Sequence, residues 1–509
     1  MRPCASIILF LAPVLTLAAC GPSASDGPVQ IAIIGEPSDL FDEGVRLSPA
    51  AQHLRGASTE GLVSLDATGQ VIPALAERWI VTDDGTSYFF RLRERDWPSD
   101  DNETGADSEE DAEADGDPVT ASDVRRALQE LLRQSEGTSL GLDLAKVTDI
   151  RVMTERVVEL RLSSPMPEFL RLLAQPELGI VKNGSGAGPM IATREDGVEA
   201  VTLSALPPQQ RGLPRREDWE ERSRPITVRA MPVNAATDAF FEGNLDLVAN
   251  GRLAEFPQVE VGPLSRGTIQ VDPALGLMGL VFRSDSGVLA DPARREALSM
   301  AIDRAELIAP LGLGGWQPTS WIVPPALFDA PTFGQSRWGD QSMEQRRATA
   351  AARMAEWRAQ SGEDEIVLRV GLPEGPGSDL LFDGISQSWA DIGVRAVQVR
   401  LGEGAELEWR DRLARYSSPR WFLNQFNCEL EIGLCSEEAD ALVRRSLDVK
   451  LLGEKERILA EAHTRLVAAE VYIPFGAPVR WSLVRGAIAA YEPNPWGLHP
   501  LFPLSGPTN

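Results

Sequence analysis

The sequence predicts an α/β protein with more than one lobe. Its 509 residues exceed what a single hydrophobic core normally serves, and 43% of them are apolar, which is enough to fill several cores. Apolar runs typical of strands alternate along the chain with segments of helical periodicity. One stretch, 365–401, has the pattern of strand, loop, helix and strand, which is a complete βαβ unit.

The chain begins with an export signal. Arg2 precedes the apolar run IILFLAPVLTLA, which is too short to span a bilayer and is typical of a secretory signal. The run ends in LAAC at Cys20, which resembles a bacterial lipobox, whose cysteine receives a diacylglycerol. We therefore expect residues 1–19 to be removed, and residues 20–28 to form a tether that a lipid on Cys20 anchors to a membrane. The alternative is an ordinary cleaved signal with a chance cysteine.

The mature chain opens with a strand, VQIAII, and continues with two well-marked helices. In 118–132, Thr120 can cap the helix together with Asp123, and apolar residues recur on one face. In 291–308, Asp291 is the expected cap and Pro292 the first helical residue.

The second half of the chain supplies more strands and helices. The βαβ unit contains the loop EGPGS, which lacks the spacing of a phosphate-binding loop and is read as a connection. The other expected elements are a buried strand in 273–282, a helix in 380–392, an amphipathic helix in 454–470, and strands with proline breaks in 471–484.

An acidic stretch, 99–117, raises the question of a calcium site. Asp111, Glu113, Asp115, Gly116 and Asp117 have the spacing of the first part of a calcium loop, but Ser122 stands where its bidentate glutamate belongs. The stretch holds ten acidic residues and no basic one. Such composition does not support a packed core, so we favour a solvated, disordered insert over a calcium loop.

Charge and motifs exclude several functions. With 49 basic and 75 acidic residues, the net charge of −26 repels nucleic acid, so no nucleic acid partner is expected. The sequence contains no H-E-x-x-H, G-x-S-x-G or C-x-x-C motif, and we expect no cofactor and no metal centre. Composition alone does not exclude an exported hydrolase that uses paired carboxylates.

The cysteines predict one disulfide. Cys4 leaves with the signal and Cys20 carries the lipid, so Cys428 and Cys435 remain, and we expect them to pair in an oxidising compartment. Closing this short loop would stabilise the fold by roughly 2 to 3 kcal/mol. The alternatives are two free thiols or a pair of metal ligands, although no histidine lies near them.

Motifs across the mature chain resemble one family. GLVSLDATGQVIPALAERW, then Trp97, Asp115-Gly116 and PVTASDV, are similar in order and spacing to a signature of the family 5 extracellular solute-binding proteins of ABC transporters, which include peptide and nickel binders. GAGPM at 186–190, the segment ADPARREALSMAIDRAEL and the closing RGAIAAYEPNPWG extend the resemblance over nearly the whole mature chain.

The resemblance implies a periplasmic-binding-protein-like fold with two lobes (three domains), a hinge and a central ligand cleft. It implies domain I from 29–58, 165–268 and 480–509, domain II from 59–164 with the insert 99–117, and domain III from 269–479. The implied function is capture of a small solute, peptide-like or a modified peptide, and its delivery to an inner-membrane permease and ATPase complex. We expect a periplasmic, lipid-anchored monomer that performs no catalysis. The alternative is an envelope lipoprotein of the same fold that acts as a solute sensor or scaffold.

The resemblance also suggests ligand contacts, but one family feature is missing. Peptide-binding relatives place an aspartate for the ligand's amino group in the stretch that here reads ARYSSPRWFLNQF, and this stretch has no acid. Unmodified short peptides therefore become doubtful cargo. The residues expected at the ligand are Glu36, Trp316, Trp321, Arg415, Tyr416 and Ser417.

Overall fold

The computed structural model describes residues 27–98, 117–194, 197–258, 268–328, 337–486, 488 and 490–506. The predicted signal, the lipidation site Cys20, residues 20–26 of the tether and residues 99–116 of the acidic insert lie outside these ranges. Within the described helices, none is both long and apolar enough to cross a membrane.

A seven-stranded sheet forms the first structural unit. The predicted strand VQIAII is β1, which lies near the middle of the sheet, is almost entirely buried, and pairs in parallel with β12 and β13. Helices α1 (Pro49–Ser58), α4 (Phe169–Leu173), α5 (Trp219–Arg222) and α6 (Val233–Glu242) accompany this sheet in the chain. Its strand order is β10 (Met190–Arg194), β11 (Val201–Ala205), β12 (Ile226–Met231), β1 (Val29–Ile34), β13 (Leu247–Arg252), β20 (Arg480–Val484) and β14 (Ile269–Val271).

A four-stranded antiparallel sheet with two helices forms the second unit. In α2 (Ala121–Gln134), Thr120 and Asp123 form the predicted capping box, and Val124, Leu128 and Leu131 are buried against the sheet. Helix α3 (Ser139–Leu144) follows, capped by Thr138. The strand order is β4 (Ala76–Val81), β5 (Ser87–Leu92), β7 (Val157–Leu162) and β6 (Val147–Thr154), and the small pairs β2–β3 (Val63–Leu65, Val71–Pro73) and β8–β9 (Val181–Lys182, Ser185–Gly186) lie nearby in the chain.

A five-stranded mixed sheet forms the third unit. The predicted βαβ unit is confirmed as β16, α10 and β17, with β16 and β17 parallel. The helix begins at Pro376, earlier than predicted, because a proline at the first helical position needs no hydrogen bond for its nitrogen. The strand order is β17 (Val394–Arg400), β16 (Ile366–Leu372), β18 (Leu407–Leu413), β15 (Gly276–Phe282) and β19 (Tyr472–Gly476).

The remaining helices accompany this third sheet in the chain. The predicted helix 291–308 is two helices, α7 (Pro292–Ala301) and α8 (Arg304–Ile308), because Asp303 caps a new helix with its carboxylate. Asp291 caps α7 as predicted. The others are α9 (Met343–Ser361), α10 (Pro376–Ala390), α11 (Pro419–Asn424), α12 (Glu437–Arg445) and α13 (Leu452–Ala468), the last confirming the amphipathic prediction.

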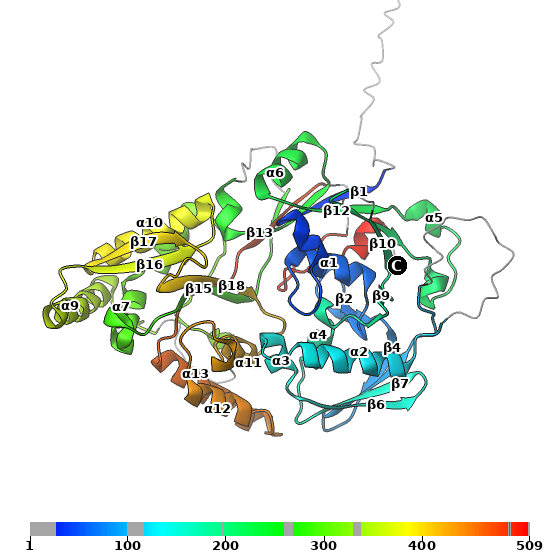
Figure 1. Cartoon of the computed structure of the whole chain (residues 1–509), viewed down its shortest axis with the longest axis horizontal. Coiled ribbons are helices and arrows are strands. Elements are labelled where there is room, and N and C mark those ends of the chain that lie inside the picture. Colours follow the sequence, from blue (N-terminus) through cyan, green and yellow to red (C-terminus); the bar gives the residue numbers. More distant parts are fainter. Residues whose placement is uncertain are drawn as a thin grey trace, which may run out of the picture.

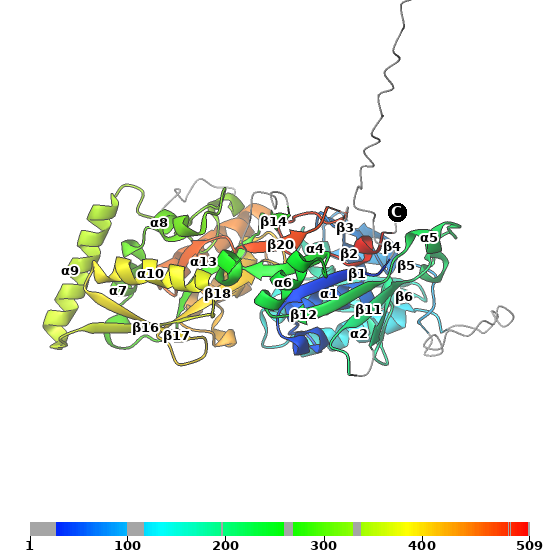
Figure 2. The ribbon, with the colours of Figure 1, turned by 90° about the horizontal axis from the view of Figure 1, so that it is seen from above.

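The three units make an elongated molecule. Figure 1 shows the third unit on one side, with α9 and α10, and the first and second units on the other, with α1 and α2. Figure 2 shows α9 at one end of the long axis and the first two units toward the other end. Two crossovers join the first sheet to the third: the chain runs from β14 to β15, and it returns from β19 to β20.

The predicted domain limits remain predictions, but two details bear on them. Strand β14 pairs with β20 in the first sheet, although its residues were expected to open domain III. Strands β19 and β20 are nearly adjacent in sequence and belong to different sheets, so the chain leaves the third unit between them. One hydrophobic core contains residues of both the second and the third unit, among them Leu144 and Tyr416.

Candidate functional site

A cavity of about 780 Å³ lies where the third unit meets the crossovers. Leu275, on the way from β14 to β15, and Ala477, on the way from β19 to β20, both line it. The rest of the lining comes from the start of β15, the end of β19, the start of α8 with the residues before it, Arg346, and the loop 317–325. The site therefore sits against both connections on which one lobe would turn relative to the other.

Glycines let the backbone elements of this wall approach closely. A Cβ on Gly276 would lie 2.0 Å from the backbone oxygen of Arg412 on the neighbouring strand. A Cβ on Gly476 would lie 2.0 Å from the ring of Trp316. Any larger residue at either position would displace the strand or the tryptophan.

The cavity lining is mainly apolar, with a few polar groups. Arg304 is buried, and its guanidinium donates to the backbone oxygen of Pro474 (2.6 Å) and to Ser299 Oγ (2.8 Å). Burial lowers the pKa of Arg304 to about 9. Tyr472 also lines the cavity; its hydroxyl is buried without a hydrogen-bond partner among the described residues, and burial raises its pKa well above the usual value.

The two predicted tryptophans have different places. Trp321 lines the main cavity, with its ring 5.7 Å from that of the buried His463. Burial lowers the pKa of His463 to about 3, so this imidazole is neutral at ordinary pH. Trp316 lies outside the main cavity and lines a smaller one of about 310 Å³, and its Nε1 donates to the backbone oxygen of Ala477 (2.9 Å).

Glu36 lies at the end of β1, outside the lining of the main cavity. It is exposed, and its backbone nitrogen donates to the carboxylate of Asp39 (2.9 Å) in the short 3₁₀ helix Pro37–Phe41. The contact predicted between Glu36 and a ligand stays a prediction.

Arg415 and Tyr416 contact the second unit rather than the cavity. Asp143, the last but one residue of α3, is fully buried and accepts hydrogen bonds from Arg415 Nη1 (3.1 Å), Tyr416 hydroxyl (3.0 Å) and Asn424 Nδ2 (2.9 Å). Its backbone oxygen accepts from Arg420 Nη1 (3.1 Å). Desolvation outweighs the neighbouring guanidinium groups and raises the pKa of Asp143. These contacts join the second and third units.

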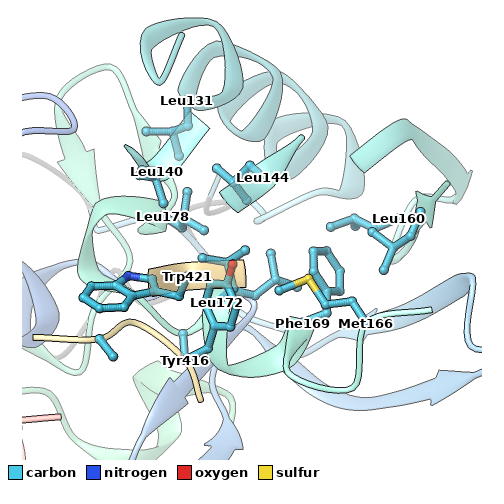
Figure 3. Packing of buried hydrophobic residues seen from close by; sticks show 14 of the residues in the cluster. Leu131, Leu140, Leu144, Leu160, Met166, Phe169, Leu172, Leu178, Tyr416 and Trp421 are labelled. Atoms are coloured by element: carbon cyan, nitrogen blue, oxygen red, sulfur yellow. The ribbon is translucent and has the colours of Figure 1, made fainter. Parts of the chain in front are cut away.

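Apolar side chains surround this polar cluster. Figure 3 shows Tyr416 and Trp421 packed among Leu140, Leu144 and Leu172 from the second unit and the segment after it. Ser417, beside them in sequence, is exposed. The ligand contacts predicted for Arg415, Tyr416 and Ser417 therefore stay predictions, whereas the structural contacts of Arg415 and Tyr416 are with Asp143.

Cys428 and Cys435 form a disulfide, with their Cα atoms 5.2 Å apart. The bridge follows α11 and precedes α12. It closes the loop that follows 415–424, the segment whose side chains contact Asp143.

Sequence reasoning missed four polar residues: Asp143, which contacts the third unit, Tyr472 in the cavity lining, and Arg410 and Arg412 on β18. For the two arginines a signal was present. The strand L-E-W-R-D-R-L places them two residues apart, and residues at that spacing share one face of a strand. For Asp143 no local signal exists, because its partners lie more than 270 residues away in the chain.

The comparisons with known proteins decide the family. The model of the "bacterial extracellular solute-binding proteins, family 5 Middle" matches residues 70–422, which is more than half of the chain. The chain belongs to this family. It is a family of solute-binding proteins rather than of enzymes.

Among curated relatives, the chain is 28% identical over 339 residues to the probable deoxycholate-binding periplasmic protein YgiS of Escherichia coli. It is 23% identical over 348 residues to the periplasmic murein peptide-binding protein MppA of the same organism. In both cases the match covers 62% of this chain and 60% of the relative, so the chain spans less than two thirds of these relatives.

Solved structures show the fold. Haemophilus influenzae OppA in complex with the peptide RPPGFSPFR has a TM-score of 0.75 at 18% identity, covering 94% of this chain and 98% of that one. The protein AgaA of A. tumefaciens R10, in complex with agropinic acid, has a TM-score of 0.68 at 18% identity, covering 94% and 97%. The predicted fold class, α/β and periplasmic-binding-protein-like, is therefore confirmed.

Proposed function

We propose that the chain is the substrate-binding component of an ABC transporter, which captures a small solute between its lobes and delivers it to a permease and ATPase complex. The observation that carries this proposal is the cavity of about 780 Å³ beside both crossovers. A solute there would touch the segments about which the lobes turn, so closure and binding would be coupled.

The family relationship and the names of the relatives support the same function. Those relatives are named for deoxycholate and murein peptide, and the structural neighbours hold a peptide or agropinic acid. The solute class of this chain is therefore a small organic molecule, either peptide-like, such as a modified peptide, or of another kind. The chain performs no catalysis on it and needs no cofactor.

Location follows from the N-terminal pattern and from the relatives, which are named as periplasmic proteins. The chain is exported, anchored by a lipid on Cys20, and works as a monomer made of domains I, II and III with the limits given above. Replacement of Cys20 by Ser should release the protein from the membrane fraction. A membrane-bound Cys20→Ser protein would contradict the lipid anchor.

A screen of solutes tests the function. The purified chain is heated with peptides, modified peptides, opines, oligosaccharides, metal chelates and deoxycholate, and its melting temperature is recorded. A solute present at one hundred times its Kd should stabilise the native state by about 2.7 kcal/mol.

Small-angle scattering on each hit then measures compaction. A hit that stabilises the chain and reduces its radius of gyration supports solute capture by lobe closure. No hit in any class, together with an unchanged radius, would leave a scaffold role as the better account.

A further inference from the structure

Two arginines of β18 flank the wall of the main cavity. Arg412 pairs across the sheet with Leu277, which lines the cavity, and Arg410 pairs with Gly279. Directly paired residues lie on the same face of a sheet, and residues two apart on one strand share that face. The side chains of Arg410 and Arg412 therefore project from the same face of the sheet as that of Leu277.

Tyr472 lies on this face too. A Cβ on Gly279 would come within 2.7 Å of the Tyr472 hydroxyl, so that hydroxyl stands over the glycine that pairs with Arg410. Tyr472 also lines the cavity. The face thus brings together two guanidinium groups and a buried hydroxyl that has no partner in the described part of the chain.

Neither arginine has an acidic partner within the described ranges. The acid between them, Asp411, points to the other face and is held by Arg480 through two hydrogen bonds (2.9 and 2.8 Å). Among the described residues, Arg410 Nη2 reaches only Gln425 Oε1 (3.4 Å), and its Nε is buried without a partner. Desolvation, and then the charge of Arg412, lower the pKa of Arg410 to about 10.

Arg412 carries a positive charge that solvent reaches. The residue is exposed, and desolvation, followed by the charges of Arg415 and Arg252, lowers its pKa. An arginine does not give up its proton at ordinary pH, so Arg412 offers a permanent positive charge to an anion that reaches this face of the sheet.

We propose that the solute is a largely apolar carboxylate, whose carboxylate accepts hydrogen bonds from Arg410, Arg412 and the Tyr472 hydroxyl while its apolar body fills the main cavity. Apolar residues outnumber polar ones in the lining, which favours an apolar body; among them are Leu275, Leu277, Met278, Ile302 and Ile322. A planar guanidinium matches a carboxylate with two parallel hydrogen bonds. This inference rests on the proposed function and names the chemical class of its solute.

Matched pairs of probes test the charge requirement. Deoxycholate is compared with its uncharged primary amide, and N-acetyl-trialanine with its C-terminal amide, by titration calorimetry on the purified chain. At least one of the two acids should bind ten-fold or more tightly than its amide, because only the carboxylate pairs with the two guanidinium groups. Equal affinity of acid and amide, or failure of both acids to bind, would overturn the inference.

Single substitutions assign the charge to these residues. Arg410→Gln and Arg412→Gln should each weaken binding of the acid ten-fold or more and leave binding of the amide unchanged. Arg369→Gln is the matched control, because this substitution removes the same net charge. Arg369 is an exposed residue of β16 that is paired with Glu406. The melting temperature of each free variant, measured in the same series, separates lost affinity from lost folding. Undiminished affinity in both folded variants would contradict the assignment.

Failure of the inference differs from failure of the function. If the broad solute screen finds an uncharged or cationic solute that compacts the chain, while the acids do not bind, the anion inference is wrong and solute capture stands. If no class binds or compacts the chain, both are wrong.

Discussion

Two parts of the third unit contain arginines, and they differ in whether an acid pairs with those arginines. Around Asp143, two guanidinium groups from 415–424 meet a buried acid and its backbone. On β18, Arg410 and Arg412 pair across the sheet with Gly279 and Leu277 of β15, of which Leu277 lines the cavity, and no acid pairs with either arginine within the described ranges. Buried charges are normally paired when their role is structural, so we interpret the contacts of Asp143 as permanent. The partly buried Arg410 and the exposed Arg412 remain available to a partner.

The largest effect is expected from removal of the buried acid Asp143. Asp143→Ala removes the carboxylate that accepts hydrogen bonds from Arg415, Tyr416 and Asn424. Loss of one partner of a buried ionic contact typically costs about 3 to 5 kcal/mol. We expect a loss of that size in the free energy of unfolding, measured by denaturant titration.

The control for this change is Asp149→Ala, which removes an exposed acid paired with Arg151. Exposed pairs contribute about 0 to 1 kcal/mol, so this variant should unfold almost as the original chain does. A similar, small effect for both variants would show that the Asp143 cluster is no tighter than a surface pair.

A second prediction concerns the stability of the fold as a function of pH, through the buried Lys146. Lys146 is buried, donates to Ser164 Oγ (2.6 Å) and to the backbone oxygen of Pro165 (3.1 Å), and has no ion pair among the described residues. Desolvation, followed by the charge of Lys455, lowers the pKa of Lys146 to about 6.

The sign of the pH effect follows. Between the folded pKa of about 6 and the unfolded value of 10.5, the unfolded chain binds more protons, so stability should rise with pH in that window. One proton gives at most about 1.4 kcal/mol per pH unit. Denaturant titrations from pH 6 to 9 should show the rise, and Lys146→Met should remove it. An equal slope in the variant would assign the effect to other groups.

Much of the fold could be predicted from the sequence because the signals are local. The capping box at Thr120 and Asp123, the cap at Asp291 and the period-two alternation of β17 each depend on a few neighbouring residues. The prediction of one helix over 291–308 was wrong because Asp303 offered a competing cap that the apolar periodicity hid.

The candidate site could be predicted only in part. Trp321 lies in the cavity lining as expected, whereas Arg415 and Tyr416 contact Asp143. That difference comes from a contact between segments far apart in the chain, which no local pattern reports.

The smallest predicted effect concerns Arg410 on β18. Arg410→Met keeps much of the side-chain volume and removes a partly buried charge that no acid of the described residues pairs with. It should therefore change the free energy of unfolding of the free chain by less than about 1 kcal/mol, or raise it. Denaturant titration without any solute measures this. The contrast with Asp143→Ala is informative, because each variant removes one charged group, Asp143 from α3 of the second unit and Arg410 from β18 of the third. A loss of several kcal/mol for Arg410→Met would mean that the arginine already supports the free fold, and the cavity wall would then need no anion to explain it.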